Sequence, residues 1–249
     1  MAAKCIPNII YMFYLLSVSC KSQPTIINGG VAIAVANEYD SAGQFIKRSE
    51  VLPAFKIWYR DSTIIEEIKR THHNTDTNGI TTMKTFLDHY TFIDLKTGSY
   101  YDYFSFSDTA IILKKYSRYD KKEILGMNFY DYAGTKLTRP IEPMTDTVVK
   151  QISYKRYKLF IKSPQPDNPA EVGIITYARC DKAGTLIDYG RSIGILQACP
   201  ITRMDYMPTK ESPYPLSFET EFLSSQLTPE ELKVFAAWQK NAKNNPVHK

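Results

Sequence analysis

Signatures of known catalytic and nucleotide-binding sites are missing from this sequence. It contains no Gly-x-Ser-x-Gly nucleophile elbow, no phosphate-binding loop, no His-Glu-x-x-His zinc motif and no dinucleotide-binding glycine pattern. Histidine is scarce as well, with 4 residues in 249, which leaves few candidates for a catalytic constellation. We therefore predict that the protein is not an enzyme and uses no cofactor.

Long apolar runs and clusters of like charge are also missing. The apolar run at residues 9–16 is shorter than the roughly 20 residues that a membrane-spanning helix needs, and no later window approaches that length. The formal net charge is +5, but lysine and arginine are scattered among acidic residues, so no nucleic-acid partner is expected. Glycine (11) is outnumbered by tyrosine (18) and phenylalanine (12), a composition that favours pleated, half-buried strands.

The first twenty residues have the layout of a secretory signal. Lys4 precedes the apolar run, and small residues follow it before Cys20. Cys20 stands where a bacterial lipoprotein signal places its acylated cysteine, although Ser17 replaces the usual large aliphatic residue. We predict a signal peptide over 1–19, a tether over 20–26, a single β-rich domain over 27–249, and lipid anchoring in the periplasm or at the outer membrane. The alternative is an ordinary cleaved signal in which Cys20 is incidental.

Two cysteines remain in the exported domain once Cys5 and Cys20 are set aside. Cys180 and Cys199 flank a turn-like segment, and an even number of cysteines in an oxidising compartment favours a bridge. We predict a disulfide between them, and two buried free thiols are the alternative. Such a bridge stabilises a fold by about 2–4 kcal/mol.

Residues 90–116 are predicted to form three short strands joined by tight turns, because Thr97-Gly98 and Ser107-Asp108 separate strongly aromatic runs. Residues 55–60 alternate as a strand. The spacing in residues 63–70 also fits a helical face, but the hairpin context favours a strand there. Thr228-Pro229-Glu230-Glu231 is a capping box that starts a C-terminal helix. The fold class is thus mainly β (α+β): a curved antiparallel sheet or half-open β-barrel with a C-terminal helix packed against it.

Few residues are candidates for site chemistry. His72, His73 and Asp76 lie in the most polar stretch of the chain, but adjacent histidines on a regular element point in different directions, so no metal is predicted. The same argument of alternating faces applies to His89 beside Asp88, and to Glu66 beside Glu67. A hydrolase would use well-placed carboxylates such as Asp94 or Asp102, for which no substrate can be proposed.

The segments FKIWYR (55–60) and YTFIDLKTGSYYDY (90–103) resemble those of small envelope proteins from Bacteroidetes-type bacteria. The resemblance is to GLPGLI-like families and to the half-barrels of lipoprotein-localisation carriers, although the GLPGLI run itself does not occur here. It covers the middle third of the chain. The resemblance implies a curved sheet with a helix on its concave side, able to hold an acyl chain or another lipophilic ligand.

Together these features predict a non-enzymatic envelope lipoprotein that binds a lipophilic ligand or an envelope partner. The membrane is its other predicted partner, through the lipid on Cys20. A carbohydrate-binding or surface interaction module, in which exposed Tyr and Trp side chains stack on sugars, is the alternative. A hydrolase is the third hypothesis.

Overall fold

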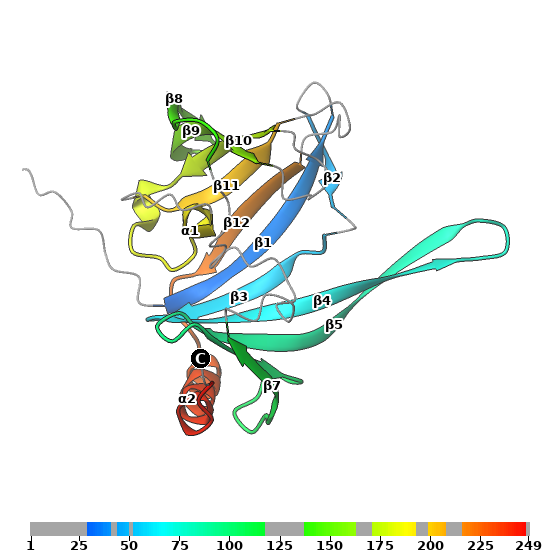
Figure 1. Ribbon diagram of the computed structural model, residues 1–249, viewed down its shortest axis with the longest axis vertical. Helices are drawn as coiled ribbons and strands as arrows, with labels where there is room; N and C mark the ends of the chain where they lie inside the picture. The colour runs from blue at the N-terminus through cyan, green and yellow to red at the C-terminus, as the bar shows by residue number, and fades with distance from the viewer. Residues whose placement is uncertain are drawn as a thin grey trace, which may run out of the picture.

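The computed structural model describes residues 29–40, 44–49, 52–117, 137–162, 171–192, 199–207 and 216–247. Within these ranges the chain forms one antiparallel sheet and two α-helices (Figure 1). The strands are β1 (Gly29–Tyr39), β2 (Phe45–Arg48), β3 (Phe55–Arg60), β4 (Thr63–Thr75), β5 (Thr81–Asp94), β6 (Ser99–Tyr103), β7 (Ile112–Ser117), β8 (Glu142–Val149), β9 (Ile152–Lys162), β10 (Glu171–Ala178), β11 (Ile201–Tyr206) and β12 (Leu216–Ser224). The helices are α1 (Tyr189–Ser192) and α2 (Pro229–Asn244), and Cys180–Lys182 forms a 3₁₀ turn.

The sheet has 12 strands in the order β7-β6-β5-β4-β3-β1-β12-β11-β10-β9-β8, and β2 pairs with the end of β1. Strands close in sequence lie side by side, so the sheet consists of two meanders joined where β1 pairs with β12. β7 and β8 are its two edges and do not pair with each other, so the sheet stays open. This confirms the predicted fold class.

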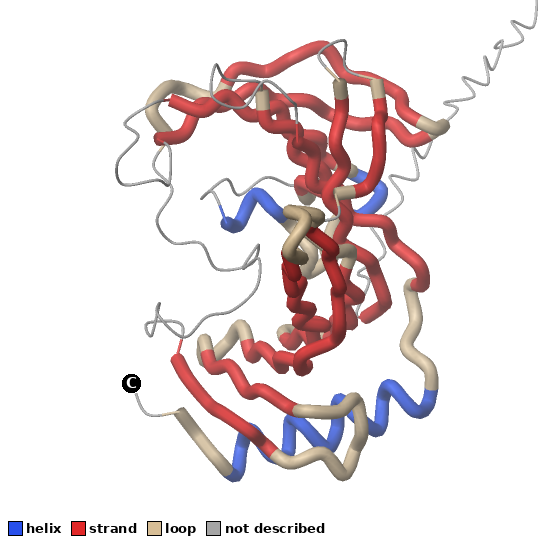
Figure 2. Tube along the Cα trace, turned by 90° about the vertical axis from the view of Figure 1, so that its right-hand side faces the viewer, coloured by secondary structure: helices blue, strands red, loops and turns tan. Residues whose placement is uncertain are grey.

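The sheet is strongly curved, and its two faces differ in what covers them (Figure 2). One face carries a single apolar cluster that joins strands from both ends of the sheet, including Tyr116 of β7 and Leu159 of β9. Side chains from strands so far apart in a sheet meet on a concave face. Tyr189 of α1 belongs to this concave cluster and is fully buried.

The convex face of the β3–β6 region is covered by α2. Its buried residues Val234, Phe235 and Trp238 pack against a second cluster that contains Trp58 and Phe92. Neighbouring residues thus enter opposite clusters: Ile64 is concave and Ile65 is convex. The C-terminal helix predicted to pack on the sheet is confirmed, but the concave position that the resemblance implied is wrong. On the convex face, large apolar side chains such as Trp58, Ile65 and Phe92 pack against the apolar stripe of α2.

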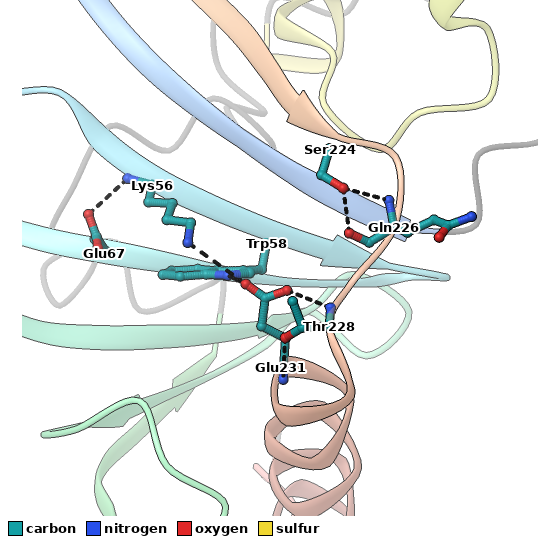
Figure 3. Close-up of polar contacts among 7 residues, drawn as sticks. All are labelled: Lys56, Trp58, Glu67, Ser224, Gln226, Thr228 and Glu231. Atoms are coloured by element: carbon teal, nitrogen blue, oxygen red, sulfur yellow. Dashed lines mark hydrogen bonds and ion pairs between the residues drawn. The ribbon is translucent and has the colours of Figure 1, made fainter.

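Glu231 anchors the start of α2 to the sheet (Figure 3). Its Oε1 accepts a hydrogen bond from Trp58 Nε1 (2.7 Å) and lies 3.8 Å from Lys56 Nζ. Its Oε2 accepts from the Thr228 backbone N–H (2.8 Å), while Thr228 Oγ1 accepts from the Glu231 N–H (3.2 Å). The predicted capping box is therefore formed, and the same carboxylate ties the helix to β3.

Two segments differ from what their sequence predicts. The polar composition of residues 37–50 predicts a loop or short helix, yet β1 runs to Tyr39 and β2 pairs with it. The sequence of residues 148–161 predicts one strand, but these residues are parts of β8 and β9 with a turn at Lys150-Gln151. Both turn residues have positive φ (49° and 65°). Hairpin turns with this conformation usually contain glycine or asparagine, which are absent from these two positions. No helix within the described ranges is both long and apolar enough to span a membrane.

Candidate functional site

The β4–β5 hairpin extends well beyond the rest of the sheet (Figure 1). β3 pairs with β4 only as far as Glu66, and β6 pairs with β5 only from Tyr90 onward, whereas β4 and β5 pair with each other out to Thr75–Thr81. We call residues 69–87 the arm. An isolated two-stranded ribbon is marginally stable in water, so a ribbon of this length needs local support.

That support begins at the tip of the arm. Asp76 Oδ1 accepts hydrogen bonds from the backbone N–H groups of Asn78 (2.8 Å) and Ile80 (2.9 Å), and Gly79 takes a positive φ of 78°. Residue 79 is glycine because the left-handed conformation strains any residue with a Cβ. Asn78-Gly79, a dipeptide typical of hairpin turns, forms the turn of this hairpin, and Asp76 stabilises it. Farther along the arm, Thr71 and Thr85 share a hydroxyl–hydroxyl hydrogen bond of 3.0 Å.

The outer edges of the arm carry backbone groups that no described strand pairs. Asp76 N–H donates to the Ile80 carbonyl (3.0 Å), so this pair is hydrogen-bonded. Hydrogen-bonded and non-hydrogen-bonded pairs alternate in an antiparallel ladder, so the pairs 75–81, 73–83 and 71–85 are non-hydrogen-bonded. Residues 71, 73 and 75 on β4, and 81, 83 and 85 on β5, therefore direct their N–H and C=O groups away from each other, toward the edges.

Large apolar side chains are exposed on both faces of the arm. They are Ile80, Met83, Phe86 and Leu87. Met83 and Leu87 share one face, and Phe86 lies on the other, where it meets the ring of His72 edge-on at 4.8 Å between centroids. The arm thus combines unpaired backbone edges with apolar side chains, which is the chemistry that a strand-forming polypeptide recognises.

A β-bulge marks the root of the arm. Ile68 pairs with His89 and Lys69 pairs with Leu87, so Asp88 is an extra residue in β5. The bulge interrupts the alternation of side chains, and His89 Nδ1 lies 2.8 Å from Asp88 Oδ2. The prediction that neighbouring residues point to opposite faces is wrong at this position, since that rule holds only for regular strands.

The Asp88–His89 pair belongs to a larger polar group, the arm-root cluster, formed by Arg70, Asp88, His89, Thr91, Asp102 and Tyr116. On the arm side, Arg70 Nε lies 2.9 Å from Asp88 Oδ2. On the sheet side, His89 Nε2 lies 3.5 Å from Asp102 Oδ1. The cluster therefore connects the arm to β6 and β7.

Asp102 is held firmly at the sheet end of the cluster. Its Oδ1 accepts hydrogen bonds from Thr91 Oγ1 (2.8 Å) and from the Tyr116 hydroxyl (3.1 Å), and all three residues are buried. Burial, and then the negative charge of Asp102, raise the pKa of the Tyr116 hydroxyl far above its ordinary value, so it remains a donor. Glu66 is buried on the same face, directly opposite Thr91 in the sheet.

Burial of His89 acts to lower its pKa, but the hydrogen bonds and charges of Asp102 and Asp88 outweigh burial. The pKa of the imidazole therefore lies above its ordinary value, and the charged form is favoured. The cluster can bind and release a proton at His89. Asp102 already has two hydroxyl donors, and this arrangement suits a structural carboxylate more than a catalytic one.

The other candidate residues have structural positions. Asp94 Oδ1 accepts from the Lys96 backbone N–H (2.9 Å) and caps a turn. Glu67 Oε2 accepts from the Lys56 N–H (3.0 Å) on the convex side, opposite to the face of Glu66 (Figure 3). Within the described ranges no three His, Cys, Asp or Glu residues come together as metal ligands. His72 and His73 lie on opposite faces of the arm, as the alternation predicts.

A half-open cavity of about 790 Å³ lies at the opposite end of the sheet. It is lined by the β8–β9 hairpin and by the segment that enters the disulfide, including Tyr154, Lys155, Arg179 and Asp181. Arg179 forms a two-pronged ion pair with Asp181. Asp146 and apolar side chains such as Val148 and Ile152 also line the cavity, and no set of donors or acceptors there points to one class of ligand.

The disulfide between Cys180 and Cys199 is formed, with the two Cα atoms 4.4 Å apart. Cys20 lies outside the described residues. A carbohydrate-binding surface would expose tryptophan side chains. Trp58 and Trp238 are instead both buried, within the apolar cluster between α2 and the convex face of the sheet. A comparison with protein-family models gives no match for this chain, and a search of curated proteins gives none either.

Proposed function

We propose that this protein is a non-enzymatic, lipid-anchored protein of the bacterial cell envelope that binds an extended segment of another protein along the edge of its arm. The signal-like segment ending at Cys20 supports export and anchoring. The arm supports the binding role, and its outward-facing backbone groups at residues 71–75 and 81–85 are the observation that carries it.

Backbone edges distinguish a protein partner from a lipid. A strand added to β4 or β5 would pair each outward N–H and C=O group, and exposed side chains such as Met83 and Phe86 would contact alternate residues of that strand. Lipid acyl chains offer no such pairing groups. A lipophilic ligand on the concave face is a weaker proposal, because its apolar side chains are already buried within the protein.

The proposal is tested by changing one backbone group of the arm. Thr85 directs its N–H outward, so Thr85→Pro removes an edge donor without breaking a hydrogen bond between β4 and β5. Thr85→Ala is the matched control, since it loses the same side-chain contact with Thr71 and keeps the N–H. A photo-reactive amino acid at the exposed Lys84 records the partner in intact cells, and mass spectrometry identifies it.

We expect a protein adduct in the Thr85→Ala background, and at least about a fivefold lower yield with Thr85→Pro, since one backbone hydrogen bond contributes about 1 kcal/mol. The same ratio is expected for the dissociation constants of the purified pair. Equal yields in the two variants, adducts with lipid alone, or adducts only between two copies of this chain would each contradict the proposal.

A further inference from the structure

The arm meets the sheet through a continuous series of charged and hydrogen-bonded groups. Arg70 lies on the arm, Asp88 is the bulge residue, and His89 stands between Asp88 (2.8 Å) and Asp102 (3.5 Å). Thr91 and Tyr116 hold Asp102 in place from β5 and β7. The bulge removes one rung of the β4–β5 ladder at this point, so the side chains of the cluster supply much of the connection.

His89 is the member of this series whose ordinary pKa lies close to neutral pH. The guanidinium of Arg70 stays charged, and Tyr116 stays protonated. A charged imidazole donates hydrogen bonds from both ring nitrogens, whereas a neutral imidazole donates from one. Nε2 of His89 lies at ion-pair distance from Asp102 (3.5 Å) and is buried without a hydrogen bond there, so the attraction between the ring and Asp102 depends on the charged imidazole.

We infer that His89 is a proton-controlled clamp at the root of the arm: the charged ring fixes the arm to the sheet, and loss of its proton frees the arm to move. This regulation rests on the proposed function, because the arm is the binding element. The strand-binding edge would then be presented in one fixed direction at low pH, and in a range of directions at higher pH.

The charges around His89 favour this direction of control. Asp88 on β5 and Asp102 on β6 face its two nitrogens, and Glu66 on β4 is buried on the same face. The positive groups, Arg70 on β4 and Lys114 on β7, lie beyond these carboxylates, paired with Asp88 and aligned with Asp102 respectively. The carboxylates are thus the nearest charges.

The pH window follows from the sign of the shift. Burial lowers the pKa of His89, and the carboxylates of Asp102 and Asp88 raise it by more. Because the folded-state pKa is above the ordinary value, the stability that the clamp contributes is fully present at pH values below that ordinary pKa. The contribution is lost as the pH rises through the raised pKa.

Two measurements on the full chain test the inference. The first is the titration of the His89 ring nitrogens by NMR, assigned by their loss in His89→Gln. We expect the pKa of His89 to lie above the ordinary histidine value. The second is hydrogen–deuterium exchange of the arm amides in the wild type, in His89→Gln and in the matched control His73→Gln, compared at each pH so that the intrinsic exchange rates cancel.

At acidic pH we expect His89→Gln to exchange its arm amides about tenfold faster than the wild type, since charge-assisted hydrogen bonds are worth more than neutral ones. At pH values above the His89 pKa the two proteins should exchange alike, and His73→Gln should match the wild type throughout. Asp88→Asn provides a second variant that breaks the arm side of the clamp and leaves Asp102 paired with Thr91 and Tyr116.

A ratio between variant and wild type that is the same at all pH values would overturn the clamp, as would a His89 pKa at or below the ordinary histidine value. Neither readout requires a partner. If these tests fail while Thr85→Pro still weakens partner binding relative to Thr85→Ala, the clamp is wrong and the proposed function stands. If both clamp measurements give the expected result but the adduct yields of Thr85→Pro and Thr85→Ala are equal, the proposed function is wrong and the proton-dependent contact at His89 stands.

Discussion

Glu231 is the residue at which the start of α2, the sheet and the preceding loop meet. Every group that faces its carboxylate is a donor: Trp58 Nε1, Lys56 Nζ and the Thr228 N–H. The sequence identified Glu231 as the third residue of a capping box, because that motif is local. The contact with Trp58, which lies 173 residues away, was not predictable from local spacing.

We expect Glu231→Gln to lower the free energy of unfolding by about 1–3 kcal/mol, because its amide nitrogen would face a donor in either orientation. Glu230→Gln is the matched control. Glu230 is exposed, and its substitution removes the same charge from the first turn of the helix. Urea denaturation of the two variants measures the difference. Equal losses of stability would show that only the charge near the helix N-terminus matters.

At the scale of elements, the strand meander of residues 90–116 and the helix α2 form one unit. Trp238 is fully buried and stacks on Tyr103 with ring centroids 3.9 Å apart, while its Nε1 donates to the Ser107 carbonyl (2.9 Å). Burial raises the pKa of Tyr103 to about 12, so its hydroxyl remains neutral at physiological pH. The aromatic residues of the meander are therefore largely core.

Trp238→Ala should destabilise the protein by about 3–5 kcal/mol, because it leaves a cavity between α2 and the meander. Lys240→Ala on the exposed side of the same helix should change stability by no more than about 0.5 kcal/mol. Thermal unfolding followed by near-ultraviolet circular dichroism reports on the Trp238–Tyr103 stack. A loss below 1 kcal/mol for Trp238→Ala would contradict the docking of α2 on the convex face.

For the whole molecule, the proposed lipid anchor at Cys20 and the proposed binding role of the arm are separate proposals, and the anchor can be tested alone. We expect palmitate labelling of the wild type in cells and its loss in Cys20→Ala. Cys5→Ala is the matched control and should label normally, because Cys5 precedes the apolar run. Equal labelling of the wild type and Cys20→Ala would exclude lipid attachment at Cys20.

The sequence by itself determined the features that depend on neighbours along the chain. Period-two alternation predicted residues 55–60 as a strand, glycine predicted the turn at Gly98, and the capping box predicted the start of α2. The disulfide was predictable because only Cys180 and Cys199 remain after the N-terminal cysteines are set aside. These predictions depend on neighbouring residues or on the number of cysteines, so they need no knowledge of the fold.

Only the tertiary structure decided what depends on register and curvature. The bulge at Asp88 brings it to His89, and pairing across three strands brings His89, Asp102 and Tyr116 together. The length of the arm follows from where β3 and β6 stop pairing, which no residue in the arm specifies. The side of the sheet that α2 covers follows from curvature, a property of all twelve strands together.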